Sequence, residues 1–387
     1  AQTKTYDGTT AADAGKFRAA LTNAIAGDSV TAAATGATYN DKNVAGASRI
    51  NYTGVALAGA DAGNYTLAAT AAQGAGTITR RMLTASAVGA QTKTYDGTRT
   101  ADAAAFHATL GNVVAGEENS VAATAAGAAY NDKNVARANA VNYTGVALTG
   151  TGAGNYAIAD TAQGAGTITR RALTLGAVAA QTKTYDGTTA ADASKFRAVL
   201  NNVVTGEENL VKATATGAAY NSKDVAAANA VNYTGVQLTG TGAGNYTLAA
   251  TTAQGTGSIT RRELTVDTVA AQSKIYDGTI AADTSKFQAT LNNVVAGEES
   301  SVTAIATGAA YNDKNVARAN AVGYTGVALA GAGAGNYTIA DTAQGTGTIT
   351  QRALTLGAVT SEQTKTYDGT TTADASKFRA VLNNVVT

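Results

Sequence analysis

The sequence predicts an all-β protein, built as a tandem array of immunoglobulin-like β-sandwich repeats of about 90 residues each. Three observations predict this fold: one tetrapeptide recurs at a near-constant interval, segments of strand length alternate polar with apolar residues, and Gly-rich turn clusters separate those segments. Tyr-Asp-Gly-Thr begins at Tyr6, Tyr95, Tyr185, Tyr276 and Tyr367, at spacings of 89, 90, 91 and 91 residues. One module is therefore copied more than four times.

The register of the aromatic residues sets the predicted repeat boundaries. Four full units with four tyrosines each, together with Tyr367, account for all 17 tyrosines. Ala1 aligns with Ala90, so the first repeat lacks its opening strand. We predict repeats over residues 1–81, 82–171, 172–262 and 263–352 and a partial repeat over 353–387, and we expect them to be a window on a longer array.

The third repeat shows the strands most clearly. Val211–Ala218 and Ala230–Leu238 alternate polar and apolar residues, and Gly240–Asn245 is a turn cluster between strands. Gly257–Val266 continues into the next repeat without a Pro-, Ser- or Gly-rich spacer. Because no flexible linker intervenes, we expect an elongated and fairly stiff rod, on the order of 130–160 Å for four modules.

One segment of each repeat has a helical pattern. In the third repeat, apolar residues spaced as on a helix face follow two candidate N-caps: Asp192 and Ser194, then Phe196, Val199, Leu200, Val203 and Val204. We predict one short helix over residues 195–204, although Phe196, Ala198 and Leu200 would also suit a strand. A β-grasp-like module of sheet plus helix is the alternative fold. The repeated Tyr and Phe are predicted to be mostly buried in the core.

Composition excludes several functions. The chain has no Cys, one His and 28 basic against 27 acidic residues, so disulfides, thiolate metal sites and nucleic-acid binding are not expected. No apolar run is long enough for membrane insertion. No nucleophile–base set or acid pair recurs as a credible constellation, so we expect no enzyme activity and no catalytic or cofactor site.

The repeated Tyr-Asp-Gly is interpreted as a structural turn, in which Asp-Gly suits positive φ and the Tyr anchors the turn to the core. A carbohydrate-contacting tip is the alternative. This structural signature comprises Tyr6, Asp7, Gly8, Tyr95, Asp96, Gly97, Tyr185, Asp186, Gly187, Tyr276, Asp277, Gly278, Tyr367, Asp368 and Gly369.

Basic residues mark each predicted junction between repeats. They could contact acidic polysaccharide as forked donors, or they could pair with acids of the preceding module. They are Arg80, Arg81, Arg170, Arg171, Arg261, Arg262 and Arg352, with Gln351 in the place of the first arginine at the last junction.

Acidic pairs recur in a loop that is two residues shorter in the first repeat. Ca²⁺ needs about six to eight oxygen ligands, so a solvated loop is preferred over a calcium site. The pairs are Glu117-Glu118, Glu207-Glu208 and Glu298-Glu299. Asp-Lys-Asn, at 41–43, 132–134 and 313–315, is interpreted as an exposed polar turn, and it becomes Ser222-Lys223-Asp224 in the third repeat.

Four motifs in fixed order carry a family resemblance: Lys-Thr-Tyr-Asp-Gly-Thr, Asp-Lys-Asn-Val, Gly-Asn-Tyr-Thr-Leu and Ile-Thr-Arg-Arg-Ala-Leu-Thr. Together they resemble the YDG and MBG (mostly bacterial immunoglobulin-like) repeats of very large, filamentous-haemagglutinin-like adhesins, many of them two-partner-secreted. That family usually has Pro after Ile-Thr, where this chain has Arg or Gln. The resemblance also permits glycosylation of the Asn-Tyr-Thr sequons at Asn51, Asn64, Asn142, Asn232, Asn245 and Asn336.

The resemblance implies an extracellular protein on a bacterial surface or in a biofilm matrix, exported through an outer-membrane secretion partner. We expect these repeats to form the stalk that projects a binding tip for cell–cell or cell–matrix adhesion. The alternative is a multivalent array in which each module carries a weak site for exopolysaccharide or a host or bacterial surface glycan. Exposed tyrosines would favour the alternative, and buried tyrosines would favour the stalk.

Overall fold

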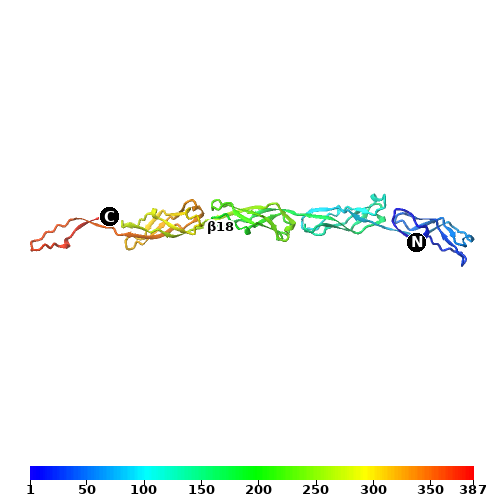
Figure 1. The fold of residues 1–387 in the computed structure, drawn as a ribbon, viewed down its shortest axis with the longest axis horizontal. Coiled ribbons are helices and arrows are strands. Elements are labelled where there is room, and N and C mark those ends of the chain that lie inside the picture. Colours follow the sequence, from blue (N-terminus) through cyan, green and yellow to red (C-terminus); the bar gives the residue numbers. More distant parts are fainter. The chain divides into compact units, whose positions relative to one another are not determined.

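A computed structural model describes residues 1–387, and the chain divides into two compact units. Unit 1 comprises residues 1–174, 202–212 and 238–249, and unit 2 comprises 175–201, 213–237 and 250–387. The first two repeats, coloured blue and cyan in Figure 1, lie wholly in unit 1. The fourth lies in unit 2 from Glu263 onward. The third contributes to both. None of the helical turns is long and apolar enough to cross a membrane.

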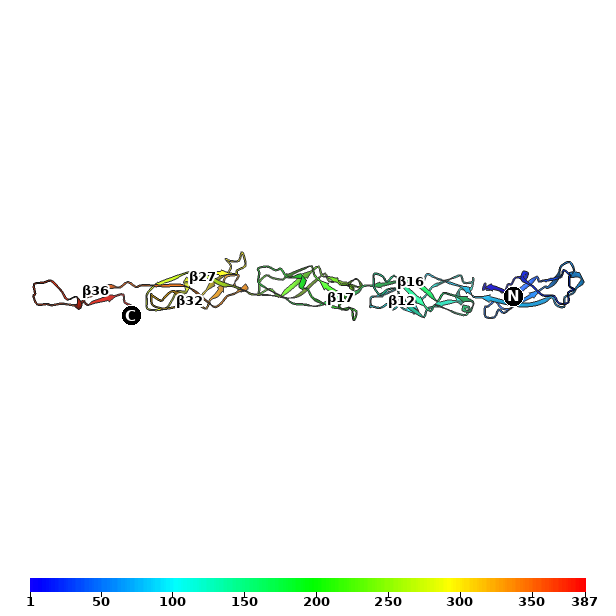
Figure 2. The same cartoon turned by 90° about the horizontal axis from the view of Figure 1, so that it is seen from below.

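In unit 1, one layer of each repeat is a four-stranded mixed sheet. In the second repeat its order is β12 (Gly127–Tyr130), β13 (Ala140–Thr144), β16 (Thr161–Thr169) and β9 (Gln91–Thr94). Figure 2 labels β12 and β16. The first three strands are antiparallel neighbours, while β9 runs parallel to β16. The first repeat repeats this order with β3 (Gly36–Tyr39), β4 (Arg49–Thr53), β6 (Ala71–Thr79) and β1 (Gln2–Thr5).

The second layer of the second repeat consists of short pairs. In it β8 (Thr84–Ser86) pairs with β10 (Thr109–Gly111), β7 (Arg81–Met82) with β15 (Tyr156–Ala157), and β11 (Ala122–Thr124) with β14 (Ala147–Thr149). In the first repeat β2 (Thr31–Ala33) pairs with β5 (Ala56–Ala58).

Unit 2 contains the same two layers in the fourth repeat. Its sheet has the order β28 (Gln272–Ile275), β35 (Thr342–Thr350), β32 (Ala321–Thr325) and β31 (Gly308–Tyr311). The opposite layer pairs β26 (Arg262–Glu263) with β34 (Tyr337–Thr338), β27 (Thr265–Val269) with β29 (Ala289–Asn292), and β30 (Thr303–Ile305) with β33 (Ala328–Ala330). Figure 2 marks β27 and β32, one strand from each layer.

The remaining strands belong to the third repeat and to the end of the chain. The third repeat places its four-stranded sheet in unit 2, with the order β18 (Gln181–Thr184), β25 (Thr252–Thr260), β22 (Ala230–Thr234) and β21 (Gly217–Tyr220). Its other strands are β17 (Arg171–Val178), β19 (Ala198–Asn201), β20 (Lys212–Thr214), β23 (Gln237–Thr239) and β24 (Tyr246–Leu248). At the end of the chain β36 (Thr355–Val359) pairs with β37 (Ala380–Asn383).

The predicted all-β fold is confirmed, whereas the predicted helix is wrong. Only single 3-10 turns occur, at residues 14–16, 62–64, 103–105, 118–120, 153–155, 193–195, 243–245, 284–286, 334–336 and 375–377. Asp192 caps the turn before Phe196 by accepting a hydrogen bond from the Ser194 N–H, and the chain then extends into β19. Phe196 is 1% exposed but Val199 is 56% exposed, so burial alternates with a period of two. A segment this short gains more from sheet pairing than from an isolated helix, so the β-grasp alternative is also wrong.

The core lies between the two layers of each repeat. In the first repeat the rings of Phe17 and Tyr52 lie 4.8 Å apart, and the buried Gln2 amide donates a 2.8 Å hydrogen bond to the Tyr52 phenol. Phe287 and Tyr324 form the same pair at 4.6 Å in the fourth repeat. The expected burial of the aromatic residues is confirmed, with four exceptions. Tyr65 and Tyr276 are half-buried, whereas Tyr367 and Phe378 are exposed.

Candidate functional site: the joints between repeats

Each Tyr-Asp-Gly segment forms a turn at the end of its repeat. In the second repeat the Asp96 carboxylate accepts hydrogen bonds from the Thr98 N–H and hydroxyl, both at 2.9 Å, and from Lys93 Nζ at 2.8 Å. Gly97 has a φ of +79°, and a Cβ at this position would lie 2.9 Å from Val204 of the next repeat. Glycine is therefore required both by the backbone conformation and by the close approach of the neighbouring repeat.

The tyrosine of this turn is buried and packs against the following repeat. Tyr95 packs edge-on against Tyr246, with ring centroids 5.4 Å apart. Both phenols donate to one carboxylate: Tyr95 to Glu207 Oε1 and Tyr246 to Glu207 Oε2, each at 2.7 Å. All three side chains are buried. The turn of the second repeat thus packs its tyrosine ring against a tyrosine of the third repeat, and one buried carboxylate accepts a hydrogen bond from each of the two phenols. We call this contact a joint.

Two further groups complete the joint. Lys133 Nζ lies 3.2 Å from Glu207 Oε1 and neutralises the carboxylate from the side of the second repeat. The buried Asn245 amide accepts from the Val135 N–H at 2.9 Å and donates to Asn134 Oδ1, also at 2.9 Å. The second repeat therefore contributes two turns, Tyr-Asp-Gly and Asp-Lys-Asn, and the third contributes an acidic loop and a Gly-Asn-Tyr turn.

The same joint recurs inside both units. Between the first and second repeats, Tyr6 and Tyr156 each donate to Glu117 at 2.7 Å. Between the third and fourth, in unit 2, Tyr185 and Tyr337 donate to Glu298 at 2.7 and 2.8 Å. Three copies of one arrangement make the joint a property of the repeat.

The divergent third copy of the Asp-Lys-Asn turn keeps its chemistry. Asp224 stands where the other repeats have Asn, and its Oδ1 still accepts from Asn336 Nδ2, at 3.0 Å. Ser222 replaces the turn Asp, and its hydroxyl still accepts the Asp224 N–H, at 3.1 Å. What the joint needs at these positions is an oxygen acceptor. The expectation of an exposed polar turn holds for the lysine of each copy, which is exposed, and the turn in addition contacts the next repeat.

Burial and hydrogen bonding act in opposite directions on the joint carboxylate. Desolvation favours protonation of Glu207, but the hydrogen bonds from Tyr246, Tyr95 and Lys133 outweigh it and hold its pKa below the usual range. The phenols respond in the opposite sense. Burial and the hydrogen bond to Glu207 raise the pKa of Tyr246 to about 12. Near neutral pH the joint therefore holds one ionised carboxylate between two neutral phenols.

Comparison with known proteins places these motifs in a family. The family model of the YDG domain matches residues 1–72, 79–163, 169–253 and 260–345. The chain belongs to the YDG domain family. A comparison with curated proteins found no match.

Among solved structures, the YDG array is similar to other multi-domain chains. Protocadherin gammaB7 EC3-6 is 11% identical, covering 90% of this chain and 97% of that chain at a TM-score of 0.30. Drosophila N-cadherin EC1-4 is 9% identical, covering 91% and 98% at 0.24. The Sidekick-1 immunoglobulin domains 1–5 are 7% identical, covering 90% and 78% at 0.25.

The arginine pairs of the YDG repeats lie where the chain passes from one repeat to the next, and they donate hydrogen bonds to the following repeat. Arg170 Nε donates to the Gly244 carbonyl at 3.1 Å, and Arg171 donates through Nε and Nη2 to the backbone and side-chain oxygens of Asn202, both at 2.7 Å. Asn202 has a φ of +72°, a conformation that Asn tolerates better than most residues. These arginines contact carbonyl and amide oxygens, so the alternative that they pair with acids of the preceding module is wrong.

The equivalent bonds recur at the other junctions. Arg80 and Arg261 donate to the Gly154 and Gly335 carbonyls, and Arg81, Arg262 and Arg352 donate to Asn112, Asn293 and Asn384. Arg80, Arg170 and Arg261 remain exposed, so they keep free N–H groups toward solvent.

The two acids of each acidic pair differ in environment. Glu207 is buried in the joint, whereas Glu208 is exposed and accepts only the Gly206 N–H, at 3.0 Å. The expectation of a solvated loop holds for the second acid and is wrong for the first. No group of three or more His, Cys, Asp or Glu gathers to hold a metal ion.

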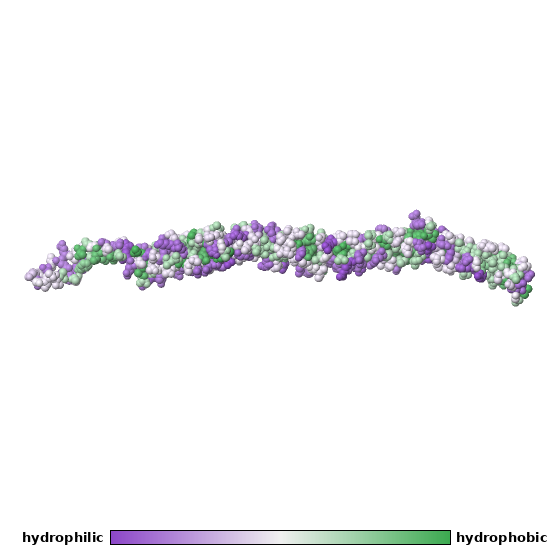
Figure 3. Space-filling view, viewed as in Figure 1, coloured by the Kyte–Doolittle hydropathy of each residue, from purple (hydrophilic) through white to green (hydrophobic).

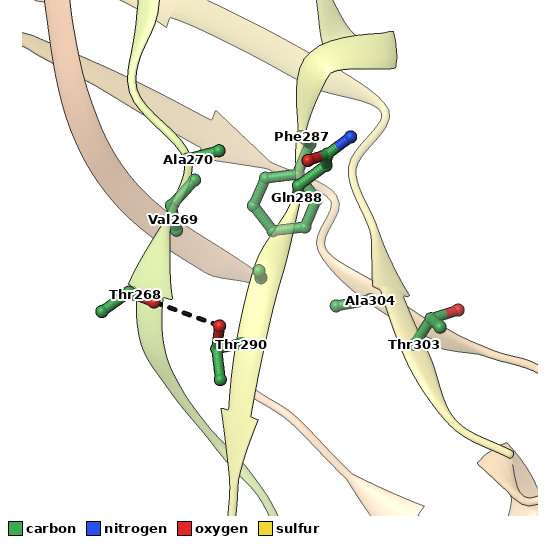
Figure 4. A pocket seen from close by; sticks show the side chains of 9 residues that line it. Thr268, Val269, Ala270, Phe287, Gln288, Thr290, Thr303 and Ala304 are labelled. Carbon is green, nitrogen blue, oxygen red and sulfur yellow. Dashed lines mark hydrogen bonds between the residues drawn. The ribbon is translucent and has the colours of Figure 1, made fainter. Parts of the chain in front are cut away.

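An open pocket in the fourth repeat has a floor formed by Phe287, between β27 and β29 (Figure 4). Thr268 Oγ1 donates to Thr290 Oγ1 at 3.1 Å along its wall, and its lining carries no titratable side chain. The corresponding pocket of the second repeat includes His107, whose Nδ1 lies 2.8 Å from the Ala105 carbonyl.

Sequence reasoning missed the joint because its partners come from different repeats. Tyr95 and Glu207 are 112 residues apart, so no local pattern connects them. One available signal was the recurrence of Lys in the Asp-Lys-Asn turn together with Glu in the acidic loop. Another was the first repeat, where Asp28 takes the place of Glu and accepts from the half-buried Tyr65 at 2.6 Å.

Proposed function

We propose that these YDG repeats form the stalk of a large secreted bacterial surface or biofilm-matrix adhesin, which projects a binding tip and mediates cell–cell or cell–matrix adhesion. The observation that carries the proposal is the joint. A flexible tether requires repeats that reorient freely, but here each full turn inserts a tyrosine beneath an acidic loop of the next repeat. Reorientation would break these hydrogen bonds and expose the rings.

The covalent connection supports the same proposal. Strand β16 ends at Thr169 and β17 begins at Arg171, so a single residue separates the last strand of one repeat from the first strand of the next. That residue, Arg170, is bonded to the Gly244 carbonyl. A connection this short has none of the freedom of a Gly/Ser linker.

The burial of the tyrosines favours the stalk over the glycan-binding array. Aromatic rings that stack on sugars must be exposed, whereas Tyr95, Tyr185 and Tyr246 are each at most 2% exposed. On the face in view, hydrophilic and hydrophobic residues are interspersed along the repeats (Figure 3). The exposed arginines Arg80, Arg170 and Arg261 are the remaining basis for weak polysaccharide contacts.

The extracellular, bacterial and two-partner-secreted setting is part of the proposal. It is supported by the resemblance of the four motifs to repeats of haemagglutinin-like exoproteins and by the absence of Cys from the chain. An outer-membrane secretion partner and a surface or matrix glycan are the implied partners. The proposal assigns the repeats no catalytic role and no cofactor.

The stalk function is tested by replacing the array in its parent adhesin. One variant carries a Gly/Ser linker of equal residue number, and a matched variant carries an unrelated rigid repeat array of similar length. We expect the flexible linker to lower adhesion and the unrelated rigid array to retain it, because only spacing matters for a stalk. If the unrelated array fails and the isolated YDG array binds exopolysaccharide, the glycan-binding alternative is correct.

A further inference from the structure

The first and last strands of the main sheet run parallel in every repeat. In the second repeat β9 pairs with β16 in the register Gln91–Gly166 through Thr94–Thr169. The same four-residue parallel pairing joins β1 to β6, β18 to β25 and β28 to β35. A parallel pair places the entry end of one strand and the exit end of the other at opposite ends of the ladder.

This arrangement determines how tension acts on a repeat. A pull along the chain enters the second repeat through β7 and β8, which are paired with β15 and β10, and from there acts on the start of β9. It acts on the end of β16 in the opposite direction, so β9 and β16 are forced to slide past each other. All the hydrogen bonds of the ladder then carry the load together. In an antiparallel hairpin pulled at its open end, the bonds would instead break one after another.

Additional bonds strengthen the exit end of this ladder. The Tyr95 N–H donates to the Thr169 carbonyl at 2.9 Å, which continues the ladder past β9. Thr169 Oγ1 donates to the Lys93 carbonyl at 3.3 Å. Tyr95 is also the residue whose phenol is held by Glu207 in the joint, so the ladder leads directly into the contact with the next repeat.

We propose that the parallel β9–β16 pair and its counterparts are mechanical clamps, which make each repeat resistant to unfolding under tension along the chain. This force-bearing role goes beyond the proposed function of holding a binding tip at a distance. It follows from the parallel direction of the two strands, and it does not depend on what the array projects. The pair bears load because β9 is an edge strand whose only ladder in this sheet is with β16. Losing that ladder would free the N-terminal strand of the sheet.

The clamp is tested by single-molecule pulling on the full chain from its two ends. The test variant is Lys93→Pro, since N–H groups alternate along a strand and that of Lys93 points to β16, as that of Tyr95 does. The matched control is Thr92→Pro, whose lost N–H faces the free edge. Lys93→Ala is measured beside it, and gives the separate effect of the side-chain bonds to Asp96 and Thr98 that both Lys93 variants lose. In Lys93→Pro we expect one unfolding event per trace to occur about tenfold faster at a given force, the effect of one lost ladder bond. The Thr92→Pro control should be close to the parent, and Lys93→Pro should unfold faster than Lys93→Ala.

A second measurement tests the clamp without a proline substitution in the ladder, by changing the direction of pulling. Handles attached at Thr94→Cys and Thr169→Cys pull on two residues that are direct neighbours at the same end of the ladder. This direction peels the bonds apart one by one, so the second repeat should open at a clearly lower force than in end-to-end pulling. Equal forces in the two directions, or a Lys93→Pro trace matching that of Thr92→Pro, would overturn the clamp. Neither outcome bears on the spacing function, which the replacement of the array tests separately.

Discussion

At the scale of single residues, one carboxylate organises each joint. Glu207 accepts two phenol hydrogen bonds and contacts Lys133, and no other acid reaches this position. Its neighbour Glu208 has the same charge and is exposed. Substituting each residue in turn therefore distinguishes the contribution of the joint to stability from the contribution of negative charge in this loop.

Replacing Glu207 should loosen the joint. In Glu207→Ala both buried phenols lose their acceptor, and each unsatisfied donor costs about 1–3 kcal/mol. We expect a loss of about 3 kcal/mol in the free energy of unfolding of residues 82–262, measured by denaturant titration. Glu208→Ala should change it by less than about 0.5 kcal/mol. Equal effects of the two substitutions would show that the joint adds no stability.

The joint should also respond to alkaline pH. The folded-state pKa of Tyr246 is raised to about 12, so the folded protein holds this proton more tightly than the unfolded chain does. The resulting stabilisation is fully present below the unfolded pKa of about 10 and is lost as the pH rises from about 10 to 12. Thermal unfolding across this range, followed with tyrosinate absorbance, should show a falling melting temperature. In Tyr246→Phe this decline should be smaller.

At the scale of elements, the segment after Phe196 shows what sequence patterns can and cannot decide. Its apolar spacing fits both a helix and a strand, and tertiary pairing decides for the strand β19. The repeat period, the turns and the burial of Phe196 were predictable from the sequence. The joint was not, because Tyr95, Glu207 and Asn245 come together only when two repeats are in contact.

Phe196 anchors this element in the core. Its ring lies 4.7 Å from that of Tyr233, and the side chain is 1% exposed. Phe196→Ala should therefore cost about 3–5 kcal/mol in the free energy of unfolding of residues 172–262. Val199→Ala, in the same strand but at a position 56% exposed, is the control and should cost less than about 1 kcal/mol. A small effect at Phe196 would contradict its placement in the core.

At the scale of the whole molecule, neighbouring repeats share stability. The folding free energy of a repeat array is approximately a sum of intrinsic terms and interface terms between neighbours. Each joint here is such an interface, made from two turns of one repeat and two loops of the next. Each repeat added to the chain should therefore increase the total free energy of unfolding by its own intrinsic term and by the term of the joint that it forms.

This expectation can be measured with one and two repeats. Residues 172–262 contain Glu207 and Tyr246 but lack Tyr95, so one carboxylate oxygen of Glu207 has no phenol and the acidic loop is uncovered. Residues 82–262 restore that joint. Since a hydrogen bond to a charged group contributes about 1.5–3 kcal/mol, the third repeat should unfold at a higher denaturant concentration in the pair than alone. Tyr95→Phe in the pair keeps the ring but removes the phenol, so it should recover only part of the gain. If the third repeat is equally stable alone and in the pair, the repeats are independent domains, and the joint cannot be what holds a stalk in line.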